Sequence, residues 1–126
     1  MIVNIRDLRR AARRALAPCR ADAGAIAALA RKLNEHQRDP THHFTKAALL
    51  RDGFGRAPHF TVFLAEIGGR PVGYALVAAS YETGWAERGL YLQDLYVSAD
   101  ARRRGVARTL IAVATRETKR CGASYL

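Results

Sequence analysis

Four arginines surround one glycine near the C-terminal third of the chain: Arg102, Arg103, Arg104 and Arg108 flank Gly105. Apolar residues precede this cluster, and residues with helical spacing follow it. Cations are unfavourable at the start of a helix, because that end already carries about half a positive charge and unpaired N–H groups. A bound phosphate would resolve the conflict, since a glycine lets phosphate oxygens reach the N–H groups and arginines add charge-assisted hydrogen bonds. The alternative is a solvated basic loop.

The flanking segments predict a strand, a loop and a helix. Residues 90–97, LYLQDLYV, are mostly apolar or aromatic, as in a strand covered on both faces. Residues 98–100 form a short loop, and a helix follows over 104–120 and ends at Gly122. The apolar face of that helix is predicted to comprise Val106, Leu110, Val113 and Ala114.

The pattern Arg102-x-x-Gly105-x-Ala107 resembles the acyl-CoA pyrophosphate loop of the GNAT superfamily of N-acetyltransferases, in which Gln or Arg is followed by Gly and then by Gly or Ala. Residues 91–97, YLQDLYV, and 49–55, LLRDGFG, are similar to stretches of the diamine (spermidine/spermine) acetyltransferase branch. The similarity runs from about Asp22 to the C-terminus. It implies an α/β fold in which helices flank a mixed, mostly antiparallel sheet.

The remaining segments fit this order. Residues 1–14 are predicted to be a basic leader, and residues 15–126 the N-acetyltransferase domain, with a weak first strand near 15–18. Further expected elements are a helix from an Asp22 cap to residues 34–36, a helix from a Thr45 cap to Asp52, a hairpin of strands 60–67 and 72–81 around Gly68-Gly69, and a strand from Ala123.

Bulk composition indicates one globular domain with a strongly basic charge. The chain has 126 residues, 21 Lys and Arg against 11 Asp and Glu, and a net charge of +10. Such a charge attracts polyanions, including phosphorylated cofactors and nucleic acid. A nucleic-acid-binding module is the less favoured interpretation, because the usual basic and aromatic motifs are missing. Without a long apolar run or a signal peptide, we expect a cytoplasmic protein that makes no membrane contact. The histidines show no metal-ligand spacing, so no metal site is predicted.

The resemblance assigns acetyl-CoA as co-substrate. It implies that the backbone groups of Leu95, Tyr96 and Val97 pair with the pantetheine arm and the thioester carbonyl, while their side chains lie in the core. It also implies a pyrophosphate site formed by Arg102, Arg103, Arg104, Gly105, Val106, Ala107 and Arg108.

The acceptor side departs from the resembled branch. Gln93 stands where the diamine acetyltransferases carry a Glu, and an amide orients an amine or a water but cannot act as a base. Asp94 is adjacent and is expected to face the opposite side of the strand as a structural hydrogen-bond acceptor. The weaker substrate candidates, each with a structural or solvated alternative, are Asn34, Glu35, His36 and Trp85.

The resembled fold continues with about one more helix and two more strands, and its thiolate-protonating Tyr lies there. The resemblance therefore predicts a C-terminally shortened domain, with a second copy of the chain covering the open edge as a homodimer. The predicted function is acetyl transfer from acetyl-CoA to a primary amine of a small molecule or amino acid side chain. A catalytically impaired CoA-binding domain is the alternative.

Overall fold

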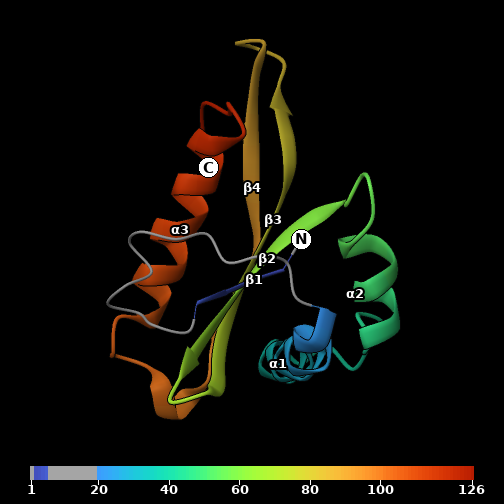
Figure 1. The fold of residues 1–126 in the computed structure, drawn as a ribbon, viewed down its shortest axis with the longest axis vertical. Helices are drawn as coiled ribbons and strands as arrows, with labels where there is room; N and C mark the ends of the chain where they lie inside the picture. Colours follow the sequence, from blue (N-terminus) through green and yellow to red (C-terminus); the bar gives the residue numbers. More distant parts are fainter. Residues whose placement is uncertain (1, 6–19) are drawn as a thin grey trace.

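A four-stranded sheet forms the centre of the molecule, and helices cover both of its faces (Figure 1). The computed structural model describes residues 2–5 and 20–126. The strands lie side by side in chain order; β1 is parallel to β2, and the other pairs are antiparallel. This confirms the predicted mixed, mostly antiparallel sheet. The strands are β1 (Ile2–Ile5), β2 (Phe60–Ile67), β3 (Arg70–Glu82) and β4 (Glu87–Val97).

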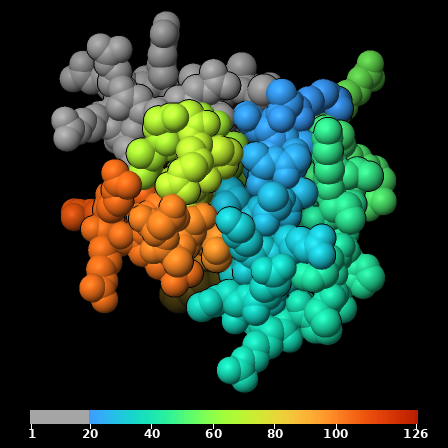
Figure 2. Space-filling view, turned by 90° about the horizontal axis from the view of Figure 1, so that it is seen from below, coloured from blue at the N-terminus to red at the C-terminus, as the bar shows by residue number. Residues whose placement is uncertain are grey.

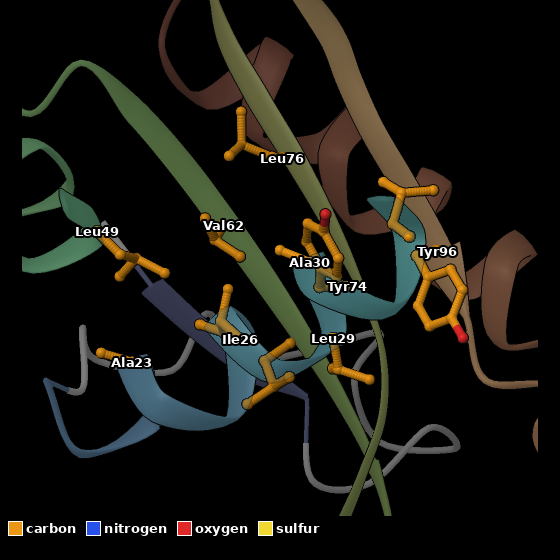
Figure 3. Close-up of a cluster of buried hydrophobic side chains, with 11 residues drawn as sticks. Ala23, Ile26, Leu29, Ala30, Leu49, Val62, Tyr74, Leu76 and Tyr96 are labelled. Carbon is orange, nitrogen blue, oxygen red and sulfur yellow. The ribbon is translucent and has the colours of Figure 1, made fainter. Parts of the chain in front are cut away.

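Two hydrophobic clusters hold the helices to the sheet. Alternate residues of a strand point to opposite faces, so each inner strand contributes to both clusters. On one face, α1 (Ala23–His36) and α2 (Lys46–Gly53) cover Val62, Tyr74 and Leu76 (Figure 3). On the other face, α3 (Val106–Arg120) covers residues that include Phe63, Ala65, Ala75 and Val77.

The predicted helices are confirmed. The Thr45 side chain caps α2 by accepting a hydrogen bond from the Ala48 N–H at 3.2 Å. Asp22 occupies the N-cap position of α1 but makes no side-chain capping bond there. The third helix begins at Val106 rather than at residue 104, because Gly105 adopts φ +79° and forms a left-handed cap. Gly122, at φ +71°, follows the end of α3 as predicted.

The N-terminal prediction needs one correction. Ile2–Ile5, placed in the basic leader by sequence, forms β1 and pairs in parallel with residues 62–65 of β2. A strand of four residues gives too little periodicity to stand out beside a run of arginines. The rest of the predicted leader and the strand expected at 15–18 lie outside the described residues. The predicted boundary between the leader (residues 1–14) and the domain (residues 15–126) stays a prediction.

The chain end begins to add a strand to the free edge of β4. Tyr125 pairs in parallel with Gly89, and the Leu90 N–H donates to the Tyr125 carbonyl at 2.9 Å. The Tyr125 hydroxyl lies 3.2 Å from Ser80 Oγ across the sheet. The strand predicted from Ala123 is therefore limited to one bridge. Further along β4, Leu95–Val97 has no neighbouring strand on this edge within residues 2–5 and 20–126.

The sequence predicted neither a membrane-spanning helix nor a metal site. In residues 2–5 and 20–126, no helix is both long and apolar enough to cross a membrane. No three metal-ligating side chains gather in the same described residues. Cys121 is an exposed free thiol, whereas Cys19 lies outside the described residues.

Candidate functional site

The segment between β4 and α3 is anchored at its start. The Ser98 N–H donates to the Val72 carbonyl at 2.8 Å and continues the pairing of β4 with β3. Residues 99–101 then form one 3₁₀ turn, in which Ala101 is fully buried against the core under α3. The loop therefore leaves the sheet from a fixed point and enters α3 through buried Val106.

Two left-handed residues shape the turn into α3. Arg103 has φ +60° and Gly105 has φ +79°. Alternation between left- and right-handed conformations directs successive N–H groups toward one point and makes a concave anion site. The strain at Arg103, which is not a glycine, is of the kind found at ligand-binding sites. The first N–H groups of any helix lack partners within the helix, and Gly105 at the N-cap of α3 has no side chain that could accept from them.

An open cavity of about 430 Å³ lies against this turn. Figure 2 looks onto this end of the molecule, where the segment around residue 100 lies beside the end of α1. The cavity brings together most of the residues predicted from the sequence. The predicted residues that line it are His36, Leu95, Tyr96, Val97, Arg102, Arg103, Gly105, Val106, Ala107 and Arg108.

Some predicted residues lie outside the cavity lining, and two lining residues were missed. Arg104 is exposed in the loop without lining the cavity. Leu33 and Ala101 line it but carry no chemical signal in the sequence. Leu33 precedes His36 by three residues on α1, so the helical period alone places it on the same face.

The open edge of β4 forms another wall of the cavity. The Arg102 side chain donates from Nε to the Val97 carbonyl at 3.0 Å, so this carbonyl points away from β3. In an antiparallel strand, alternate residues direct their backbone groups to the same side. The Leu95 N–H and C=O therefore also face outward. The Leu95 and Val97 side chains pack under α3 and Tyr96 packs under α1, as expected (Figure 3).

Gln93 lies at a bulge in β4 and has no partner residue in β3. Leu92 and Leu95, on either side of it, both pack against the cluster under α3, although three steps along a regular strand would place them on opposite faces. The expectation that Gln93 and Asp94 face opposite sides assumed a regular strand, and the bulge breaks that regular alternation. The Gln93 side chain is exposed, and it does not line the cavity.

Asp94 is a hydrogen-bond acceptor within the structure, as the sequence suggested. The hydroxyl of fully buried Tyr74 donates to Asp94 Oδ2 at 3.0 Å. Burial raises the pKa of Tyr74 far above its ordinary value of 10.0, and the nearby Asp94 carboxylate raises this pKa further. The pair fixes the strand immediately before the cavity wall.

This raised pKa predicts how Tyr74 affects stability. Unfolded Tyr74 loses its proton near pH 10.0 while folded Tyr74 retains it, so its stabilising contribution is complete below that pH and decreases above it. We expect Tyr74→Phe to lower the free energy of unfolding by about 1 kcal/mol at neutral pH. The difference from wild type should shrink in alkali by up to about 1.4 kcal/mol per pH unit. Urea unfolding at several pH values measures the free energy of unfolding of each protein. Tyr91→Phe, at an exposed tyrosine, is the control. If the free energy of unfolding depends on pH equally in both variants, the prediction is refuted.

The three substrate candidates at the end of α1 have different surroundings. Asn34 Nδ2 donates to the Thr41 carbonyl at 2.7 Å and so holds the loop that follows α1. Glu35 lies 3.7 Å from Arg31 in an exposed i,i+4 pair. His36 alone among the three lines the cavity. The structure thus gives Asn34 and Glu35 partners away from the cavity.

Trp85 lies far from the other candidates. It is 81% exposed in the turn between β3 and β4, at the opposite end of the sheet from the loop that enters α3 (Figure 1). The structure does not bring Trp85 to the cavity. Trp85 was a weaker substrate candidate, and the sequence alone could not show that this hairpin extends away from α1.

A mixed sheet lies between two helical layers, and a left-handed glycine turn leads into α3 beside the open edge of the sheet. These features define an α/β protein. Residues 23–126 match the family described as Acetyltransferase (GNAT) family. Because this match covers most of the chain, the protein belongs to the GNAT acetyltransferase family. The resemblance inferred from the loop and from β4 is thereby confirmed.

Relatives and solved structures agree with this assignment. The chain is 35% identical over 99 residues to thialysine N-epsilon-acetyltransferase of Bos taurus; the match covers 71% of this chain and 58% of that protein. The chain therefore spans little more than half the length of this relative. A ribosomal-protein-alanine N-acetyltransferase from Brucella melitensis has a TM-score of 0.69 at 24% identity, covering 86% of this chain and 73% of that one. An aminoglycoside N-acetyltransferase solved in complex with CoA has a TM-score of 0.64 at 21% identity, covering 86% and 72%.

Proposed function

We propose that this protein binds acetyl-CoA and transfers its acetyl group to a primary amine of a small molecule or an amino acid side chain. One observation carries the proposal. The left-handed residues Arg103 and Gly105 shape the N-terminus of α3 beside a cavity that the open edge of β4 also lines. This combination suits a ligand with an anionic end and an amide-containing arm.

Three parts of acetyl-CoA would have counterparts in the cavity: the pyrophosphate, the pantetheine arm and the thioester carbonyl. The pyrophosphate would accept hydrogen bonds from the backbone N–H groups of residues 105–108, with arginine guanidinium groups nearby. The pantetheine amides would pair with the outward N–H and C=O of Leu95 and with the outward N–H of Val97, whose carbonyl is held by Arg102, as a strand pairs with a sheet edge. A backbone N–H of β4 would polarise the thioester carbonyl, on which negative charge develops during transfer. In this arrangement the side chains of Leu95, Tyr96 and Val97 remain in the core.

The acceptor amine would approach between the end of α1 and the bulge of β4. We propose that Gln93 orients the amine or a water molecule, because an amide accepts and donates hydrogen bonds but cannot remove a proton. His36 is the one of the predicted acceptor residues at the cavity itself. The thialysine acetyltransferase relatives, named for an amine substrate, support a small primary amine as acceptor.

We also propose a homodimer and a cytoplasmic location. Tyr81, Trp85 and Tyr91 are exposed on the β3–β4 hairpin, and aromatic side chains are enriched where proteins contact one another. The free thiol of Cys121 is consistent with a reducing compartment. Light scattering after size-exclusion chromatography tests the dimer, and a monomer at all concentrations would refute it.

The function is tested by calorimetric titration of the 126-residue chain with acetyl-CoA, followed by detection of released thiol with a panel of primary amines that includes thialysine. Micromolar binding and amine-dependent thiol release are expected. Binding without turnover would favour the CoA-binding alternative, which the Gln at position 93 supports. Absence of binding by protein that circular dichroism shows to be folded would overturn the proposal. Salt-sensitive binding to arbitrary duplex DNA would then point to the nucleic-acid interpretation.

A further inference from the structure

We infer that Arg102 is a positioning residue: through Nε it ties the loop before α3 to the end of β4 and holds the anion-binding N–H groups in place. This inference rests on the proposed function of the loop. It assigns Arg102 a role different from the phosphate contact expected from its charge, because the bond to the Val97 carbonyl employs Nε.

The bond to Val97 closes a short ring of backbone. Arg102 and Val97 are separated by five positions, and the Nε–O distance is 3.0 Å. Between them, buried Ala101 and the Ala101 N–H bond to the Ser98 carbonyl, at 2.9 Å, fix the inner side of the ring. On the outer side, Arg70 Nη1 pairs with Asp100 Oδ2 at 2.8 Å, but both side chains are more than half exposed. This ion pair holds Asp100 to β3, whereas the Arg102 bond holds the residue directly before Arg103 to the end of β4.

The residues that need this tether follow Arg102 directly. Arg103 holds φ +60°, a conformation that costs a residue with a Cβ roughly 1–2 kcal/mol relative to the right-handed form. Such a conformation persists only where its surroundings enforce it. With Arg102 bound to Val97 on one side and Val106 buried on the other, the intervening turn has little freedom to relax. Loss of the tether would lower the population of loops that are ready to bind an anion.

Because the hydrogen bond to Val97 comes from Nε, substitutions at position 102 can remove the positive charge and the hydrogen bond separately. A glutamine at position 102 would place Nε2 the same number of covalent bonds from Cα as arginine places Nε, and both atoms donate hydrogen bonds. Arg102→Gln therefore removes the charge and keeps a donor for the Val97 carbonyl. Arg102→Met removes both while keeping a side chain of similar length. At Arg104, which does not line the cavity, the same two substitutions remove a charge without affecting this bond.

The test compares the Kd for acetyl-CoA of wild type and of four variants: Arg102→Gln, Arg102→Met, Arg104→Gln and Arg104→Met. One net hydrogen bond corresponds to about a fivefold change in Kd, so Arg102→Met should bind about five times more weakly than Arg102→Gln. The two Arg104 variants should match each other. Thermal unfolding monitors folding, which we expect to be unaffected because Arg102 is exposed.

Rescue by glutamine decides the outcome, since a purely electrostatic contact to phosphate would not be rescued. If Arg102→Gln binds as weakly as Arg102→Met, then Arg102 acts through its charge and the inference is overturned. If both bind like wild type, the tether has no role and the inference is equally overturned. A wild-type chain that does not bind acetyl-CoA would instead refute the proposed function itself, before any variant is compared.

Discussion

Replacing Gly105 with valine is expected to weaken acetyl-CoA binding by about 30-fold or more. Gly105 has φ +79°, and the left-handed conformation costs a residue with a Cβ up to about 2 kcal/mol, more for a β-branched one. A Cβ at Gly105 would meet no protein atom within 4 Å, so it would project into open space at the start of α3. That space is where phosphate oxygens would approach the unpaired N–H groups. Both the strain and the bulk therefore act on the proposed anion site, and calorimetric titration measures the loss.

Gly55 provides a matched control. It also has a positive φ, +99°, and a Cβ there would likewise meet no atom within 4 Å, but it lies in the exposed connection between α2 and β2. Gly55→Val should therefore lower the free energy of unfolding by a similar amount, about 1–2 kcal/mol, and leave the Kd for acetyl-CoA unchanged. Wild-type affinity in Gly105→Val would show that the backbone around residue 105 does not hold the pyrophosphate.

The sequence was informative where local chemistry decides the structure. Gly68 and Gly69 adopt φ +58° and +76°, so the turn between β2 and β3 follows directly from two residues that favour left-handed conformations. Thr45 begins α2 because its own side chain satisfies an N–H of the first turn. The arginines beside Gly105 indicated an anion site for the same local reason, and the structure places most of them along one cavity.

Features that depend on a distant partner could not be predicted in this way. The bulge that leaves Gln93 unpaired arises from the register between β3 and β4, which no property of residues 90–97 specifies. Asn34 was an acceptor candidate at a helix end, yet its amide binds the Thr41 carbonyl, a contact that requires the following loop to fold back. The sequence pattern accepts either Gln or Arg at position 102, and the Nε bond to Val97 offers a physical reason, because both side chains place a donor at the same reach.

Adding a methyl group at Gly73 is expected to damage both the fold and the cavity. A Cβ at Gly73 would lie 2.7 Å from the Tyr96 carbonyl oxygen, 3.3 Å from Val97 Cγ2 and 3.4 Å from Val106 Cγ1. The nearest atom belongs to the backbone of β4, so it can move only if the cavity wall moves with it. We expect Gly73→Ala to lower the free energy of unfolding by about 1–3 kcal/mol, as overpacked cores do. We expect acetyl-CoA affinity to fall as well, because the Cβ would displace the end of β4 relative to the start of α3.

Gly24 distinguishes this effect from a general cost of replacing glycine. A Cβ at Gly24 in α1 would meet only Lys46 Cδ at 3.9 Å, an ordinary contact, and a helical alanine restricts the unfolded chain. Gly24→Ala should therefore raise the free energy of unfolding by about 0.5 kcal/mol and leave the Kd for acetyl-CoA unchanged. Urea unfolding and calorimetry of both variants give the comparison. If Gly73→Ala retained wild-type stability and affinity, the end of β4 would be free to shift without affecting the ligand, and the cavity wall formed by Leu95–Val97 would not be the surface that orders the pantetheine arm.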